Sequence, residues 1–363
     1  MDTPLPKVSQ KQSPFAAGLK DNLPLIAVLL VLGALPFLVA VLDGQPLGEV
    51  LRNASGNSKF IQGLLIEVFI LAIYALSYDL VLGIVGLLSF GHAMFFGVGA
   101  YLTGIMLKSF GWPLLPTLGL VILAGIVQAL LFGLVLPRVQ GITFALVTLG
   151  IASVFHIVIM SSELGSLTGA DVGLQGVTAP AFINPSTQRL RFYFIALVIL
   201  FLVYLLYRRF VSSPTGRVCV AIRENEGRAR MLGYNTFHFK LVALVIASIT
   251  AAIAGMLHTL HSPIVSPNVA SLGFTVSALL MILIGGVGTL SGAIVGAATY
   301  RLLQFYLEKF FGENASFIIG LVYVLLVLFV PYGIVGTWKM RSFDLQRGRA
   351  RLLQALGLQQ KQF

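Results

Sequence analysis

Nine long apolar stretches constrain this chain more than any other feature of its sequence. A helix needs roughly 20 apolar residues to cross about 30 Å of hydrocarbon. The candidate spans are residues 24–42, 61–82, 86–107, 114–136, 141–160, 191–211, 240–262, 274–308 and 314–336. Because backbone polar groups must be paired within lipid, such segments form helices. We therefore expect an all-α, polytopic transmembrane bundle of about eight to ten spans.

The composition excludes several other classes of protein. Only 10% of the 363 residues are charged and 57% are hydrophobic, whereas soluble domains carry roughly 25% charged residues. This chain cannot cover a globular surface with polar groups, so it is neither a soluble enzyme nor a disordered chain. The single cysteine, Cys219, permits no internal disulfide. The net charge of +11 fits basic cytoplasmic loops better than a nucleic-acid partner, which we do not expect.

The first apolar stretch predicts a retained span rather than a cleaved leader. Three lysines precede it, but its run of about 19 residues exceeds a signal core and no A-x-A site follows. We predict a cytoplasmic N-terminal tail at residues 1–23 and a transmembrane domain at residues 24–338. A basic cytoplasmic tail at residues 339–363 is expected to lie on the anionic membrane surface.

The stretch at 274–308 is too long for one crossing. As a straight helix its 35 residues would reach about 52 Å, and glycines interrupt it between Ile284 and Gly292. We predict two shorter helices joined by a glycine-rich break. If they form a hairpin and the N-terminus lies inside, seventeen basic residues face the cytoplasm and five face outwards. This bias predicts that both termini are cytoplasmic.

Two glycine-rich segments indicate an internal repeat. Residues 83–89 read GIVGLLS and residues 285–291 read GGVGTLS, which makes five of seven positions identical at an offset of 202. Both lie where one helical piece gives way to another, which favours duplication over coincidence. Broken helices in paired positions are typical of a transport pathway. The competing interpretation is that these glycines only allow close helix packing.

A basic loop at residues 212–239 carries the signals of a short amphipathic helix. Ser213 is a suitable N-cap, Pro214 suits the first turn and Gly233 suits the C-terminal stop. Val218, Ile222, Ala229 and Leu232 follow a helical period. Glu224 with Arg228, and Glu226 with Arg230, are favourable pairs four residues apart. Such a helix either rests in the membrane interface or docks into a partner.

Five blocks of sequence stand out between about residues 83 and 332. They are GIVGLLSFGHAMFFGVGAY at 83–101, RVQGITFALVTL at 138–149, TGADVGL at 168–174, GRVCVAIRENEGRARMLG at 216–233 and GGVGTLSG at 285–292. In this order they resemble the LivM-type permeases of branched-chain amino-acid ABC importers. The departures from the family pattern are Thr143 in place of a tyrosine, Ala170 in place of a glycine, and Gly227 and Arg228 within an alanine-rich core.

The resemblance implies a transport subunit of the bacterial inner membrane that is not an enzyme. Such permeases pair with a related LivH-type permease and two ATP-binding subunits, and a periplasmic or lipid-anchored binding protein delivers the substrate. The chain has no Gly-Lys pair and so no phosphate-binding loop lysine after a glycine. No cofactor of its own is therefore expected, and ATP would be bound by the partners.

Two groups of residues are the predicted sites. The substrate pathway is assigned to Gly83, Gly86, Ser89, Gly91, His92, Thr148, Gly286, Gly288 and Ser291. With the resemblance, the basic loop becomes a coupling segment, and the contacts with the ATPase are assigned to Arg217, Arg223, Glu224, Glu226, Arg230 and Gly233. Thr148 could bond either substrate or its own helix. His92 is read equally as a structural donor or a functional group.

The sequence also contains ionisable residues outside these two groups, and it leaves two other functions open. Glu67 and Asp79 lie within a span, and we favour structural roles for them. His258 and His261 would need further ligands to hold a metal, so no metal site is predicted. A urea or short-amide permease would share the glycine pattern. An ion-coupled secondary transporter would instead import without any ATPase.

Overall fold

The computed structural model describes residues 14–44, 56–329 and 332–338, together with residues 46, 48 and 53. The predicted C-terminal tail and residues 1–13 of the N-terminal tail lie outside this part. The first half of the described chain contains α1 (Pro14–Leu42), α3 (Asn57–Asp79), the π-helix η1 (Leu80–Ile84), α4 (Ala93–Lys108), α5 (Leu114–Gly133), α6 (Ile142–Met160), η2 (Ser162–Leu164), α7 (Gly165–Thr168), η3 (Ala170–Val172) and β1 (Leu174–Gln175). The second half contains α8 (Arg189–Ser212), α9 (Pro214–Glu224), α10 (Glu226–Met231), α11 (Thr236–His261), β2 (Ile264–Val265), η4 (Pro267–Ala270), α12 (Leu272–Gly285), α13 (Leu290–Phe311), η5 (Gly312–Asn314) and α14 (Ala315–Phe329).

The described part is almost wholly helical, as predicted, and it forms two units. The first unit comprises residues 1–62 and the second residues 63–363. Within the first, the Ser58 hydroxyl donates a hydrogen bond to the Pro36 carbonyl at 2.8 Å. This contact joins α1 to the first turn of α3. All of the predicted site residues belong to the second unit.

Each predicted span contains a helix, but not every helix is long enough to cross a bilayer alone. Among the described residues, five helices pass by length and apolarity, and the bent pair α12–α13 makes a sixth. The predicted eight to ten spans counted three further segments. Of these, α4 has 16 residues, α14 has 15 and the apolar part of α1 covers Ala27–Leu42. Helix α4 is shorter than its predicted span, because the chain stays non-helical through residues 86–92 and the helix begins only at Ala93.

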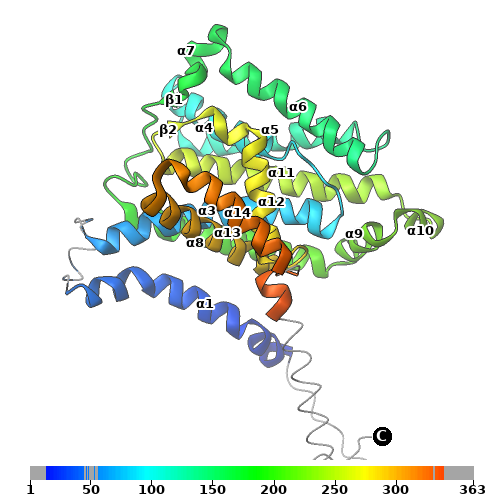
Figure 1. The fold of residues 1–363 in the computed structure, drawn as a ribbon, viewed down its shortest axis with the longest axis horizontal. Helices are drawn as coiled ribbons and strands as arrows, with labels where there is room; N and C mark the ends of the chain where they lie inside the picture. Colours follow the sequence, from blue (N-terminus) through cyan, green and yellow to red (C-terminus); the bar gives the residue numbers. More distant parts are fainter. Residues whose placement is uncertain are drawn as a thin grey trace, which may run out of the picture. The chain divides into compact units, whose positions relative to one another are not determined.

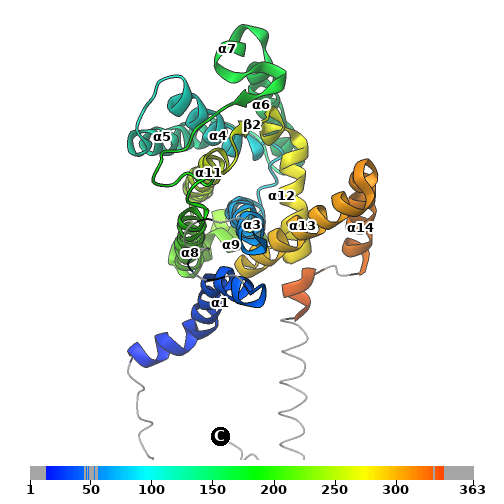
Figure 2. The ribbon, with the colours of Figure 1, turned by 90° about the vertical axis from the view of Figure 1, so that its left-hand side faces the viewer.

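Helix α11 is the centre of the second unit and packs most extensively on α4 and α5. Small residues permit this close approach, as they do in many membrane bundles. A methyl group on Gly125 would lie 3.0 Å from the Ile249 Cα, and one on Gly255 would collide with the Phe96 carbonyl. The Ser248 hydroxyl donates to the Gly125 carbonyl at 2.8 Å. Figure 2 looks nearly along these packed helices.

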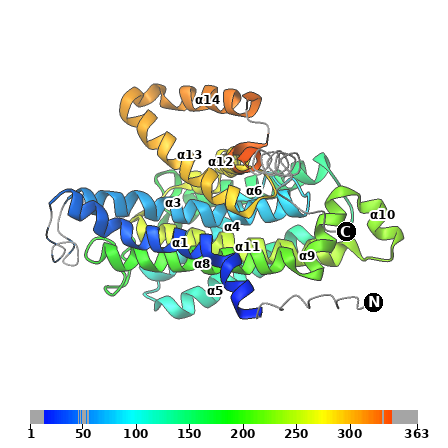
Figure 3. The ribbon, with the colours of Figure 1, turned by 90° about the horizontal axis from the view of Figure 1, so that it is seen from below.

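The two ends of the second unit differ in what they carry. Helices α3, α8 and α11 run along a common direction, with α9 and α10 at one end of them (Figure 3). We call this the α9 end. Helix α11 starts there at Thr236 and finishes at the opposite end, where β1 and β2 pair antiparallel with Leu174 opposite Val265.

The predicted break in the 274–308 stretch is confirmed. Helices α12 and α13 are bent by 115° at residues 286–289, and α12 crosses the direction of α4, α6 and α11 (Figure 1). Just before α13 begins, the Gly288 N–H donates a hydrogen bond to Asp79, the last residue of α3. Further along, Arg301 bonds Glu67, nearer the start of α3. Helix α13 therefore runs back along α3 toward the opposite end, which gives this segment the path of a hairpin.

Candidate functional site

The two glycine breaks, although about 200 residues apart in sequence, meet in the fold. A methyl group on Gly83 would lie 2.5 Å from the Gly288 nitrogen, so only hydrogen allows this approach. Gly86 and Gly288 are equivalent positions of the repeat, and both have positive φ, +81° and +75°. Glycine adopts this backbone region without steric cost. The two copies thus share a left-handed glycine at the same position, and we call Gly83, Gly86, Gly286 and Gly288 the glycine junction.

A buried carboxylate fixes the second break against the first. Asp79 ends α3 and is fully buried. Its Oδ1 accepts a hydrogen bond from the Gly288 backbone N–H at 2.7 Å. On the other side, the Tyr332 carbonyl would lie 2.8 Å from a methyl group on Gly286. The second break is therefore enclosed by chain on both sides.

Arg223 of α9 reaches into the glycine junction. Its Nη1 donates to the Gly83 carbonyl. Its Cγ would lie 2.7 Å from a methyl group on Gly86, and its Nη1 would lie 3.0 Å from one on Gly288. The same guanidinium bonds Glu224 through Nη2 at 2.7 Å. A residue predicted for ATPase contact thus connects α9 directly to both predicted pathway segments.

Three further predicted pathway residues, Gly91, His92 and Thr148, are buried against neighbouring parts of the chain. The His92 Nε2 and the Ser77 hydroxyl form a hydrogen bond at 2.8 Å, and the His92 ring packs edge-on against Tyr78. The Thr148 hydroxyl donates to Ala145 of its own helix at 2.8 Å, which is the second of the two roles weighed for it. Its carbonyl lies so close to Gly91 that a methyl group there would overlap it.

The two predicted serine liners differ in exposure. Ser89 is fully buried, whereas Ser291 is half-buried in the first turn of α13. Neither lines the cleft of about 690 Å³ that opens between α3, α12 and α13. The glycine segments therefore act in this conformation as a packed junction, and their assignment to the pathway stays a prediction.

The predicted coupling helix is two helices rather than one. Ser213 caps α9 by accepting from the Gly216 N–H at 3.2 Å, with Pro214 at the first position, as predicted. Asn225 then leaves the helical region, with φ −160° and ψ 99°, and caps α10 by accepting from the Arg228 N–H at 2.8 Å. Gly233, with φ +86°, follows the end of α10.

The break at Asn225 corrects two sequence predictions. Glu224 and Arg228 do not form their expected pair, because they lie on different helices, and Glu224 bonds Arg223 instead. Leu232 does not continue the buried stripe, because α10 ends at Met231 and leaves this side chain 72% exposed. Ile222 and Ala229 are buried as the pattern predicted. Arg217 is exposed on α9.

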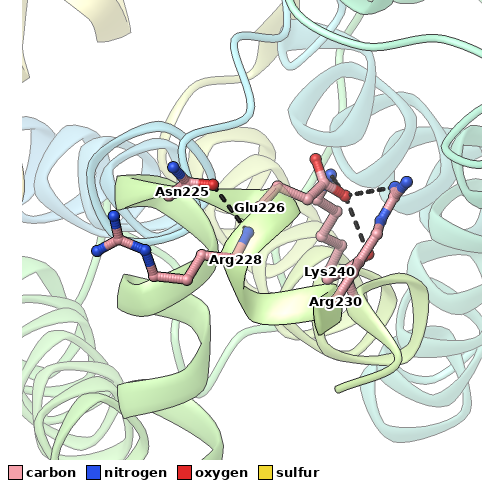
Figure 4. Close-up of polar contacts among 6 residues, drawn as sticks. Asn225, Glu226, Arg228, Arg230 and Lys240 are labelled. Atoms are coloured by element: carbon pink, nitrogen blue, oxygen red, sulfur yellow. Dashed lines mark hydrogen bonds and ion pairs between the residues drawn. The ribbon is translucent and has the colours of Figure 1, made fainter. Parts of the chain in front are cut away.

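Four residues at the α9 end form what we call the Glu226 cluster: Glu226, Arg230, Thr236 and Lys240. The Glu226 Oε1 accepts from Lys240 at 2.7 Å, Arg230 at 2.8 Å and Thr236 at 2.9 Å. Figure 4 shows Arg230 and Lys240 converging on Glu226 while Arg228 points away from them. The pair with Arg230 was predicted. Lys240 was missed, although a buried lysine at the start of an apolar stretch signals a nearby carboxylate.

The cluster joins the α9–α10 segment to the first turns of α11. Burial alone raises the pKa of the Glu226 carboxyl. The hydrogen bond and charge of Lys240, with the hydrogen bonds of Thr236 and Arg230, outweigh burial and hold that pKa below its ordinary value. Glu226 is therefore ionised at neutral pH. Beyond the cluster, Met231 and Leu232 are exposed at 84% and 72% and form an apolar patch on α10.

Comparison with known proteins decides the family. The family model described as "Branched-chain amino acid transport system / permease component" matches residues 60–330. The chain belongs to this permease family. The match covers both glycine segments, the α9–α10 segment and the whole of the α12–α13 hairpin. All of the contacts of the glycine junction described above except that of Tyr332 lie within it.

Several curated members of the permease family are similar over most of the chain. The high-affinity branched-chain amino acid transport system permease protein LivM of Salmonella typhimurium is 26% identical over 310 residues, which cover 78% of this chain and 71% of that protein. The probable LivM permease of Methanocaldococcus jannaschii is 31% identical over 153 residues, 41% of this chain and 44% of that one. LivH of Salmonella typhimurium is 24% identical over 280 residues, 73% of this chain and 91% of LivH. No solved structure matches the chain.

Proposed function

We propose that this chain is a permease subunit of an ATP-driven importer that carries branched-chain amino acids across the bacterial inner membrane. Its relatives bear that substrate in their names. Similarity to both LivM and LivH supports pairing with a LivH-type sister permease. Two ATP-binding subunits supply the energy, and a periplasmic or lipid-anchored binding protein delivers the substrate. The chain itself needs no cofactor.

The observation that carries this proposal is the contact between Arg223 and the glycine junction. An imported solute must be released on one side after entering from the other, so motion at the ATPase must reach the pathway. Arg223 belongs to α9 and bonds the Gly83 carbonyl, so a displacement of α9 acts directly on the first break. Because Gly288 packs against Gly83, the second break moves with it.

The proposal assigns the α9 end to the cytoplasm. The segment from Arg208 to Lys240 holds seven basic residues, the densest such group in the described chain, and basic loops face the cytoplasm. The apolar patch of Met231 and Leu232 then faces an ATP-binding subunit. An exposed apolar pair rimmed by charges is typical of the centre of a protein interface.

Reconstitution tests the proposal. The chain, its sister permease and two ATP-binding subunits are placed in vesicles with the binding protein outside and ATP inside. We expect L-leucine to accumulate only with enclosed ATP, and accumulation to survive ionophores that collapse proton and sodium gradients. Uptake that follows an ion gradient without ATP would show a secondary transporter instead. Uptake of urea in place of leucine would retain the ATP-driven class and overturn the substrate.

A further inference from the structure

A cleft with polar and apolar walls lies apart from the glycine junction, in the part of α3 nearer the opposite end. Its volume of about 690 Å³ falls within the ~300–1,000 Å³ of small-molecule sites. Side chains of α3, η4, α12 and α13 line it, among them Glu67, Leu71, Asn268, Phe274, Arg301 and Glu308. Nothing in the family match or in the sequence predictions assigns a role to this cleft.

The cleft contains an ion pair that involves α3, one of the helices long and apolar enough to cross a membrane. Glu67 lies ten residues into α3, which is about 15 Å from its start at 1.5 Å per residue. The Arg301 Nε donates to the Glu67 Oε2, and the His261 Nε2 lies 3.9 Å from the Oε1. The side chains of Glu67 and Arg301 keep 34% and 19% of their exposure. Ionisable groups inside spans are costly and mark transport paths by default.

The rest of the wall suits an aliphatic side chain. Leu71 lines one side of the cleft. Phe274 lines another, with its ring stacked on Tyr74 at 4.9 Å between centroids. A second carboxylate, Glu308, lies along α13 and accepts from Gln304 at 2.8 Å. One cationic group, two carboxylates and an apolar wall therefore share one space.

We propose that this cleft binds the zwitterionic form of a free amino acid, with its carboxylate on Arg301, its ammonium on Glu67 and its aliphatic side chain against Leu71 and Phe274. This deepens the proposed function and rests on it for the choice of L-leucine. Breaking a partly buried ion pair leaves uncompensated charge. A zwitterion replaces each partner with a group of the same sign, so the pair opens without leaving either charge bare. Guanidinium also pairs with carboxylate in a strong two-point geometry.

The test measures access to the cleft in the complete permease complex, without ATP or binding protein. Asn268→Cys provides an exposed thiol on the cleft wall, and Ser166→Cys provides an exposed control outside it. Burial raises the pKa of the native Cys219 thiol to about 11, so it reacts little at neutral pH. A membrane-impermeant thiol reagent then reports occupancy of the cleft as a modification rate.

We expect L-leucine at about ten times its dissociation constant to slow modification of Asn268→Cys about tenfold, because only the free fraction reacts. Ser166→Cys should be unaffected. 4-Methylpentanoate lacks the ammonium and 3-methylbutylamine lacks the carboxylate, and neither should protect at that concentration. Equal rates with and without leucine, or equal protection by all three compounds, would overturn the proposal.

Substitutions of Glu67 and Arg301 test whether this ion pair binds leucine or only stabilises the fold. Glu67→Gln and Arg301→Gln should each abolish protection by leucine, while Arg301→Lys should retain part of it. Retained protection in both glutamine variants would contradict the assignment. If these variants fail to assemble, the three-ligand comparison on the unaltered pair still decides. Protection without ATP-driven uptake would refute only the proposed function, and uptake without protection would refute only the site.

Discussion

At the scale of single residues, the glycine junction depends on positions where only a hydrogen side chain fits. Gly83 touches the Gly288 backbone, and Gly86 and Gly288 share a positive φ. The sequence repeat predicted that these segments correspond. It could not predict that they touch, because contact depends on how α12 crosses the bundle. Nor could it predict that Arg223 points into the junction, because this follows from where α9 ends, at Glu224.

Gly83→Ala should impair transport and stability together. The added methyl would lie 2.5 Å from the Gly288 nitrogen, and such overpacking typically costs about 1–3 kcal/mol. We expect a lower melting temperature of the purified complex and at least a severalfold loss of import. Gly119→Ala is the matched control, because nothing lies within 4 Å of its added methyl on α5. Equal melting temperatures and equal import in the two variants would contradict close packing at the glycine junction.

At the scale of elements, a helix break decides the geometry of the α9–α10 segment. The cap, the proline and the stop at Gly233 were readable from sequence because capping is local chemistry. The break at Asn225 was missed because the 212–235 pattern fits one continuous amphipathic helix. The contact of Glu226 with Lys240 spans 14 residues and a change of direction, which no periodicity encodes.

The Glu226 cluster gives a pH prediction. The folded pKa of Glu226 is depressed, so its stabilising contribution is complete above the unfolded value of about 4.3 and is lost as pH falls through the lower folded value. Glu226→Gln leaves Lys240 buried with its charge uncompensated and should cost about 1–2 kcal/mol at pH 7. In thermal unfolding, the gap to the unaltered protein should stay constant from pH 8 to about 5.5 and shrink below about pH 4. A gap that instead grows on acidification would contradict this role.

The apolar patch on α10 should contribute to assembly. Met231 and Leu232 are 84% and 72% exposed and bury no core surface, so Met231→Ser with Leu232→Ser should leave the melting temperature of the permease unchanged. Their burial in an interface is worth about 1–3 kcal/mol each. We therefore expect at least tenfold weaker association with the ATP-binding subunits in a titration. Undiminished association would place the ATPase contact elsewhere.

At the scale of the whole molecule, the sequence predicts the fold class because a helix that crosses lipid needs a long run of apolar residues. Large exposed side chains such as Leu115 on α5 and Ile157 on α6 are 79% and 67% exposed, as expected where a helix face meets hydrocarbon. The pairing of Glu67 with Arg301 was not readable. This pairing depends on which residues of α13 lie beside which residues of α3. The predicted hairpin gave the direction of α13 but not this alignment.

The central claim is that α9 passes motion from ATP-binding partners to the glycine junction through Arg223. Leucine import and ATP hydrolysis measured on the same reconstituted vesicles test it most directly. Arg223→Ala should keep hydrolysis near the unaltered rate and reduce leucine imported per ATP at least severalfold, while Arg228→Ala, whose side chain points away from the Glu226 cluster (Figure 4), should preserve the ratio. An unchanged ratio in Arg223→Ala would contradict the account.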